Sequence, residues 1–115
     1  MNSIEKQQLK YALKEDFDFT TDEIKCLFKF DEFFNDSYFT NKYLRATIDI
    51  NVNKSFTVDF MLYFKNKEFY INLIDEDNNE ITIYEEYLDN ITMQHTNYII
   101  NKLKNILDNL TAINI

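Results

Sequence analysis

The segment LRATIDINVNKSFTVDFMLYF, residues 44–64, decides the fold of this 115-residue chain. Apolar side chains occupy every second position on both sides of Asn53-Lys54, namely Leu44, Ala46, Ile48, Ile50 and Val52, then Phe56, Val58, Phe60, Leu62 and Phe64. This period of two is typical of half-buried strands. Asn tolerates the positive φ of a tight turn, so the segment predicts a β-hairpin.

Two shorter alternating runs follow the hairpin. Phe69, Ile71 and Leu73 form one run, and Ile81 with Ile83 forms the other. Asn66 and Asn78-Asn79 stand between the runs, where they suit tight turns. The sequence therefore predicts a four-stranded antiparallel meander.

Helices are expected at both ends of the chain. Asn2 and Thr20 each precede a Glu by three residues, which is the spacing of a capping box. These starts predict a helix over 4–14 and one or two short helices over 21–36, and apolar spacing predicts a last helix over 93–110. The prediction is a single α+β domain, residues 1–115, in the order ααββββα, with the helices on one face of the sheet.

Composition excludes several classes of protein. The chain has no Gly, which excludes the P-loop and the dinucleotide-binding fingerprint, and its single Cys excludes an internal disulfide. No apolar run reaches the length of a membrane span, and the first residues do not resemble a signal peptide. We therefore expect a cytoplasmic protein without a membrane partner.

Charge is distributed unevenly along the chain, which holds 20 acidic and 12 basic residues and has a net charge of −8. Residues 15–36 carry eight acids and two lysines, and residues 68–101 carry eight acids and no Lys or Arg. The remaining 59 residues hold four acids and ten bases. Crowded like charges repel one another and destabilise a fold. The two windows are explained either by simple solvation or by a surface that a basic partner recognises.

Direct binding to nucleic acid is not expected, because such proteins carry a basic footprint. An acidic surface can instead imitate the phosphate backbone and occupy the groove of a DNA-binding protein. The segment Asp75-Glu76-Asp77-Asn78-Asn79 would project at a hairpin tip, where it could enter such a groove.

Catalytic and metal chemistry find little support. His95 is the only histidine and has no ligand pattern around it, and Cys26 lies in an apolar stretch typical of a core residue. The acids of 75–80 lack the Gly and the spacing of a calcium loop. We expect no metal, no cofactor and no enzymatic activity. The aromatic run Phe28, Phe30, Phe33 and Phe34 is assigned to the core, although an exposed subset would suit an apolar partner side chain.

Several short motifs match a known family in the same order. They are Ile4-Glu5-Lys6-Gln7-Gln8-Leu9-Lys10-Tyr11 leading to Asp22-Glu23 and Cys26, then Phe60-Met61-Leu62-Tyr63-Phe64, Ile74-Asp75-Glu76 and Tyr87-Leu88. With these motifs the chain resembles the staphylococcal uracil-DNA glycosylase inhibitor family, a set of small acidic DNA mimics. The resemblance covers a little over half of the chain and is poor over 37–59.

The resemblance implies a protein that fills the DNA-binding groove of uracil-DNA glycosylase. Carboxylates of Asp22, Glu23, Asp75, Glu76 and Asp77 would replace phosphates, and an apolar pocket would take up the side chain that the enzyme inserts into DNA. Two positions depart from the family: Lys25 stands where it has a glutamate, and Asn78 stands where it has a histidine.

Two alternatives remain open at this stage. One is a phage or mobile-element DNA mimic directed at another DNA-binding protein, such as a CRISPR effector. The other is an acidic accessory protein without mimicry, for which charge reversal across 75–77 would change no binding property.

Overall fold

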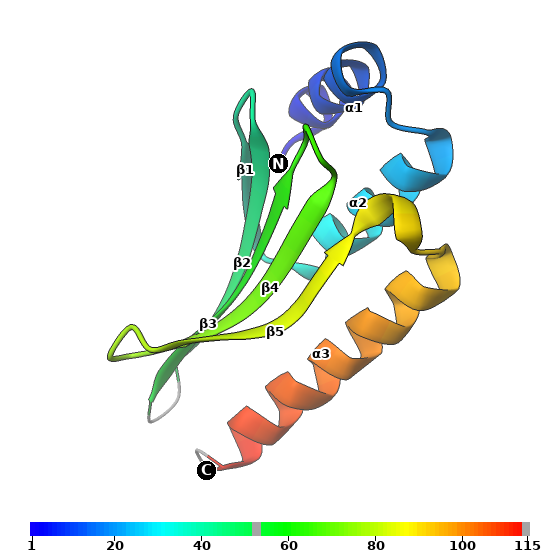
Figure 1. Cartoon of the computed structure of the whole chain (residues 1–115). Helices are drawn as coiled ribbons and strands as arrows, with labels where there is room; N and C mark the ends of the chain where they lie inside the picture. Colours follow the sequence, from blue (N-terminus) through cyan, green and yellow to red (C-terminus); the bar gives the residue numbers. More distant parts are fainter. Residues whose placement is uncertain (52–53, 114–115) are drawn as a thin grey trace.

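The computed structural model describes residues 1–51 and 54–113, and its elements follow the order ααβββββα. The helices and strands are α1 (Ser3–Phe17), α2 (Thr21–Phe33), β1 (Asp36–Phe39), β2 (Tyr43–Asn51), β3 (Ser55–Tyr63), β4 (Glu68–Asp75), β5 (Glu80–Tyr87) and α3 (Met93–Ile113), with a 3-10 turn, η1, at Leu88–Asn90. All neighbouring strands are antiparallel, in the order β1-β2-β3-β4-β5 (Figure 1). The expected α+β meander is confirmed.

The prediction of four strands is wrong by one, and the predicted helix over 21–36 is too long. α2 ends at Phe33 because Phe34 already has an extended backbone, with φ −86° and ψ 150°. The N–H of Asn35 then donates to the carbonyl of Thr47 at 3.1 Å, which starts the pairing of β1 with β2. β1 has only four residues, too few to display a period of two.

Both predicted capping boxes are present. The amide of Glu5 donates to Asn2 Oδ1 at 2.8 Å, and the Asn2 amide donates to Glu5 Oε1 at 3.1 Å. Thr20 and Glu23 make the same exchange at the start of α2, at 3.1 and 2.7 Å. Each box satisfies two amides that a helix start leaves without partners.

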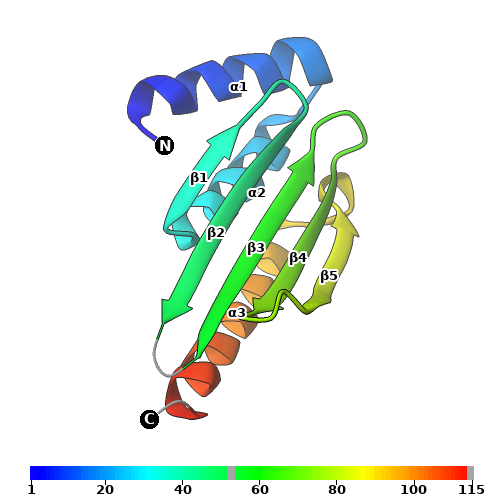
Figure 2. The ribbon, with the colours of Figure 1, turned by 90° about the vertical axis from the view of Figure 1, so that its left-hand side faces the viewer.

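The core lies between the sheet and the helices α2 and α3, which run along one side of it in Figure 1. Phe60 of β3 is fully buried and stacks on Phe30 of α2 and Phe69 of β4, with ring centroids 5.0 and 5.6 Å apart. Figure 2 shows the opposite face of the sheet, which no helix covers among the described residues. The alternation of side chains along the strands, which a bulge interrupts in β5 opposite Ile71 and Asn72, therefore supplies one core face and one open face.

The turns follow the expected chemistry in one case and depart from it in another. Asn78 has φ 63°, as predicted for the turn between β4 and β5. In the turn between β3 and β4 the positive φ falls on Lys67, at 60°, and not on Asn66. The Asn66 side chain instead accepts the amide of Glu68 at 3.2 Å. The predicted turn residue Asn53 lies outside the described residues.

Within the described part of the chain, none of the helices combines the length and the apolar character needed to cross a bilayer.

Candidate protein-binding surface

The second acidic window folds into one structural unit. All eight of its carboxylates lie within residues 68–89, which comprise β4, β5, the turn between them and η1, and we call this unit the acidic edge. β5 is the last strand of the sheet, so this unit borders solvent along its length. Its carboxylates lie toward the two ends of the strand pair: Asp75, Glu76, Asp77 and Glu80 at the tip, and Glu68, Glu85, Glu86 and Asp89 toward the other end.

The tip of the acidic edge is held in shape by one of its own carboxylates. Asp75 accepts the amides of Asp77 and Asn79, both at 2.9 Å, and the Asn79 side-chain amide at 3.0 Å. The Asn79 hydrogen bonds, followed by that from Asp77, keep the pKa of Asp75 below its usual value. Glu76 and Asp77 remain exposed at the tip. Of the three predicted tip acids, one braces the turn and two are free to meet a partner.

Two more acids of the acidic edge lie beside Tyr70 on the open face. Tyr70 of β4 pairs with Glu85 of β5, and its hydroxyl donates to Glu68. That hydrogen bond is the main reason that the pKa of Tyr70 is raised to about 12. Tyr70 therefore remains a neutral hydrogen-bond donor to Glu68 at neutral pH.

Glu86 is the one carboxylate of the acidic edge with an ion-pair partner among the described residues. Its Oε2 lies 2.9 Å from Nε2 of His95, whose ring stacks on Tyr98. His95 thus lies at a boundary and is half-buried. Cys26 is 3 % exposed in the core and does not line the hollow that holds His95. A Cys–His nucleophilic pair therefore finds no geometric support.

Clusters of three or more metal-ligating side chains do not occur in residues 1–51 and 54–111.

The first acidic window does not form a surface of this kind. Its acids are spread over the end of α1, both ends of α2 and the start of β1. Glu23 and Asp31 are buried, at 7 % and 6 % exposure, and Glu32 lies 3.9 Å from Lys29. Asp22 is exposed at the start of α2. The hypothesis of one crowded negative surface is therefore wrong for the first window, and for the second window it stays a proposal.

Glu23 takes part in the predicted capping box and also in an ion pair with Lys67 that its sequence context did not predict. Glu23 Oε1 accepts a hydrogen bond from the Thr20 amide at 2.7 Å and lies 3.0 Å from Nζ of Lys67. The same Nζ lies 5.0 Å from the centre of the Phe19 ring. Burial by itself would raise the pKa of Glu23, but the Thr20 amide and the Lys67 ammonium outweigh it and the pKa is lowered. Glu23 Oε2 is buried without a hydrogen-bond partner.

The six predicted site residues therefore separate into two groups. Lys67 precedes β4, so Glu23 and Asp22 lie near the beginning of that strand, whereas Asp75, Glu76, Asp77 and Asn78 lie at its far end. The length of the strand places the groups roughly 24 Å apart. A single small contact cannot include both.

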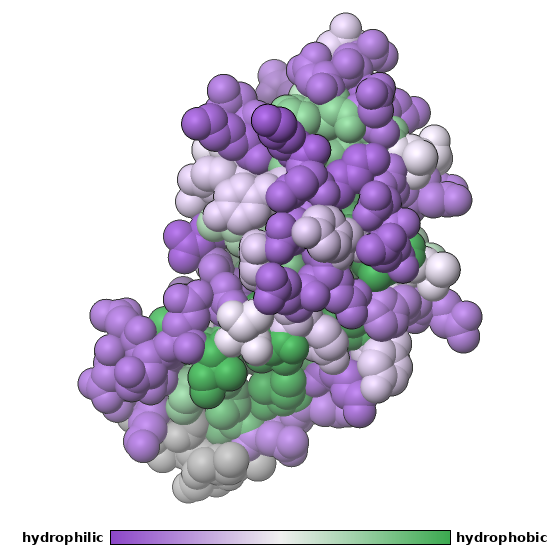
Figure 3. Space-filling model, viewed as in Figure 1, coloured by the Kyte–Doolittle hydropathy of each residue, from purple (hydrophilic) through white to green (hydrophobic). Residues whose placement is uncertain are grey.

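An apolar surface accompanies the acidic edge near its tip. Ile81 of β5 is 65 % exposed and pairs with Leu73 of β4. Ile106 and Leu107 are half-buried on the second half of α3. Ile83 is the extra residue of a bulge in β5, because Tyr84 pairs with Ile71 and Thr82 pairs with Asn72, so the predicted alternation of Ile81 and Ile83 is interrupted. Figure 3 shows apolar surface between the hairpin tip and α3, with hydrophilic side chains around it. We call Leu73, Ile81, Ile106 and Leu107 the apolar patch.

The two departures from the family resemblance have different surroundings. Asn78 occupies the left-handed backbone region, which Asn enters more readily than most residues. Lys25 is exposed on α2 and lines a groove between α1 and α2, far along the chain from the acidic edge.

A scan against models of protein families, a search of curated proteins and a search of solved structures each found no match for this chain.

Sequence reasoning missed a row of tyrosines on the open face. Tyr38, Tyr43, Tyr63 and Tyr70 come from four successive strands, with neighbouring ring centroids 6.2, 6.1 and 6.3 Å apart. Each tyrosine is unremarkable within its own strand. The row becomes visible only when the strand register is known. Tyr43 lies opposite Tyr63, and Tyr38 lies opposite Arg45, which is two residues from Tyr43 along β2.

Proposed function

We propose that this protein is a stoichiometric DNA-mimic inhibitor whose acidic edge occupies the DNA-binding groove of uracil-DNA glycosylase. The observation that carries the proposal is the gathering of eight carboxylates, without any Lys or Arg, on one two-stranded unit. Such crowding costs stability through repulsion. Scattered acids would be sufficient for solubility. Binding of a basic partner therefore explains why the acids are gathered on one unit.

The carboxylates have separate roles in this proposal. Glu76, Asp77, Glu80 and Glu85 are exposed and replace phosphates against the lysines, arginines and helix N-termini of the enzyme. Asp75 shapes the tip, and Glu23 stabilises α2 from within. Asp22 makes a second, separate contact with the enzyme at the other end of β4.

The apolar patch is the anchor of the proposed complex. Its exposed member, Ile81, lies beside the acidic tip and receives the apolar side chain that the enzyme otherwise inserts into DNA. Buried apolar anchors supply most of the binding energy of an interface, whereas rim charges mainly accelerate association. The two features are therefore expected to act on different rate constants.

A titration of uracil excision against the purified protein tests the proposal. We expect complete inhibition at equimolar protein, with bacterial and viral glycosylases as targets. The triple variant Glu76→Gln/Asp77→Asn/Glu80→Gln should associate about tenfold more slowly at low salt, with the difference shrinking at high salt. Ile81→Ser should dissociate about tenfold faster or more.

The matched control is Glu15→Gln/Asp16→Asn/Asp108→Asn, which removes three charges from exposed positions outside the acidic edge. It should inhibit like the parent protein. Full glycosylase activity at a large molar excess of the parent protein excludes this target. Equal effects of both triple variants exclude the acidic edge as the binding surface.

A further inference from the structure

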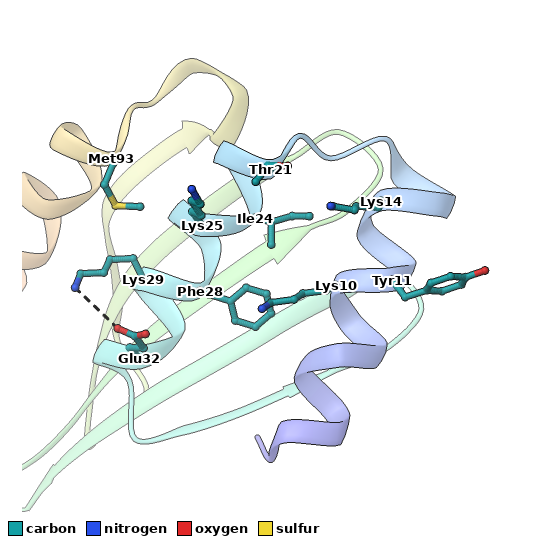
Figure 4. A pocket seen from close by; sticks show the side chains of 10 residues that line it. All are labelled: Lys10, Tyr11, Lys14, Thr21, Ile24, Lys25, Phe28, Lys29, Glu32 and Met93. Atoms are coloured by element: carbon teal, nitrogen blue, oxygen red, sulfur yellow. Dashed lines mark ion pairs between the residues drawn. The ribbon is translucent and has the colours of Figure 1, made fainter.

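A groove of about 500 Å³ lies between α1, α2 and the start of α3. In Figure 4, Lys10 and Lys14 reach from α1 toward α2, whereas Tyr11 points away from α2. The other lining side chains come from a continuous stripe along α2 and from the start of α3. The full set is Lys10, Tyr11, Lys14, Thr21, Ile24, Lys25, Phe28, Lys29, Glu32 and Met93. We call this the basic groove.

The charge of the basic groove is opposite to that of the molecule. Four of the 12 basic residues of the chain line it, against a single glutamate. That glutamate, Glu32, lies 3.9 Å from Lys29. Lys10 reaches inward, and its Nζ lies 5.2 Å from the centre of the Phe28 ring. The groove therefore attracts anions on a chain whose net charge is −8.

The shape of the basic groove suits a segment of protein chain. The α2 stripe from Thr21 to Glu32 extends over three helical turns, roughly 16 Å. Ile24 and Phe28 form an apolar floor, whereas Tyr11 and Met93 at the margins are 70 % and 37 % exposed. Sites for small ligands usually enclose most of the ligand. An open apolar floor beside a helix is typical of helix-in-groove recognition.

We propose that the basic groove docks an acidic amphipathic helix of a partner protein. Apolar residues of that helix cover Phe28, Ile24 and Met93, and carboxylates beside them meet Lys14, Lys25 and Lys29. This interaction goes beyond the proposed inhibition, because it uses another surface and the opposite charge. The protein then joins a basic partner at the acidic edge to an acidic partner at the groove.

A direct binding measurement with the full chain tests the docking site. The probe is a fluorescent peptide of about four helical turns, with apolar residues at i, i+3, i+4 and i+7 and glutamates elsewhere. The control peptide has the same composition in an order that destroys the apolar stripe. We expect the amphipathic peptide to bind about tenfold more tightly than the control peptide, and its amide-shift map to centre on Phe28 and Lys25.

Charge reversal separates the groove from general electrostatics. Lys25→Glu/Lys29→Glu should weaken peptide binding about tenfold or more. Lys102→Glu/Lys104→Glu introduces the same charge change at exposed positions on α3 and should leave the affinity within about twofold. Circular dichroism and urea unfolding verify that each variant is folded. Neutralising the acidic edge should not weaken the binding of the peptide.

Three results would overturn the proposal. The first is equal binding of the two peptides, which indicates unspecific attraction of acids. The second is tighter binding of a DNA duplex or of dodecyl phosphate than of the amphipathic peptide, which assigns the groove to nucleic acid or to a small amphiphile. The third is no peptide binding up to millimolar concentration. None of them bears on glycosylase inhibition, so the two proposals fail independently.

Discussion

The two acidic windows of this chain hold eight carboxylates each, and the fold uses them in different ways. In the first window, Glu23 and Asp31 are buried in α2 and Glu32 lies near a lysine. In the second window, Glu86 is the one acid with an ion-pair partner among the described residues. The comparison teaches that charge density along a sequence does not predict charge density on a surface.

Secondary structure explains the difference. The first window crosses helix ends, where carboxylates cap amides, and one face of α2 turns toward the core. The second window occupies a strand pair at the edge of the sheet, where side chains on alternate positions point outward on the open face. Acids on an edge strand also discourage pairing with another sheet.

Removing the cation beside Glu23 should have the largest effect on stability. Lys67→Met keeps most of the side-chain stem but leaves a buried carboxylate without its ammonium partner, which lies 3.0 Å away. We expect the free energy of unfolding to fall by about 2–3 kcal/mol, at the low end for a buried pair because Lys67 is partly exposed. Urea unfolding measures the change.

The matched control is Lys65→Met, which removes the same charge from an exposed position two residues away. It should change the free energy by less than about 0.5 kcal/mol. Equal effects of the two variants would mean that the Lys67 pair does not stabilise the fold.

The second prediction concerns the charge of Glu23 and its pH dependence. Glu23→Gln keeps an oxygen for the Thr20 amide and should cost about 1–2 kcal/mol at pH 7. The folded pKa of Glu23 is below its ordinary value of 4.5, so its contribution is complete above 4.5 and is lost as the pH falls through the folded pKa. The stability gap between parent and variant should therefore narrow in acid, as urea unfolding at several pH values would reveal.

Glu76→Gln is the control, because it removes one charge from the exposed tip. It should change the free energy of unfolding by less than about 0.5 kcal/mol at pH 7. A gap for Glu23→Gln that stays constant down to acidic pH would contradict the role of the charge.

The sequence predicted the features that depend on neighbouring residues. The hairpin over 44–64 and the capping boxes at Asn2 and Thr20 follow from spacings of two and three residues. Lys67, the ion-pair partner of Glu23, is 44 residues away in the sequence, so no local pattern predicts this contact. The same limit hid β1 and the basic groove, which needs both α1 and α2.

The third prediction tests the tip of the acidic edge. Asp75→Ala removes the acceptor of the Asp77 and Asn79 amides, which lie 2.9 Å from its Oδ1. Amide hydrogen exchange at these two positions should become about fivefold faster, while exchange in α2 stays unchanged. Because the pKa of Asp75 is also lowered, the protection in the parent protein should weaken as the pH falls through that value. Unchanged exchange at the tip would show that the turn does not depend on this carboxylate.

The smallest predicted effect is a gain in stability, whereas the earlier variants lose stability. It distinguishes the two acidic windows most directly. Glu76→Gln/Asp77→Asn/Glu80→Gln relieves repulsion on the acidic edge without breaking an ion pair of the described structure. We expect the melting temperature to rise by about 2 °C at low salt, because the repulsion of crowded exposed charges is weak, and the gain to vanish in high salt. Calorimetry at two salt concentrations measures it. A fall in melting temperature would mean that these acids stabilise the fold, and stability alone would then explain the acidic edge.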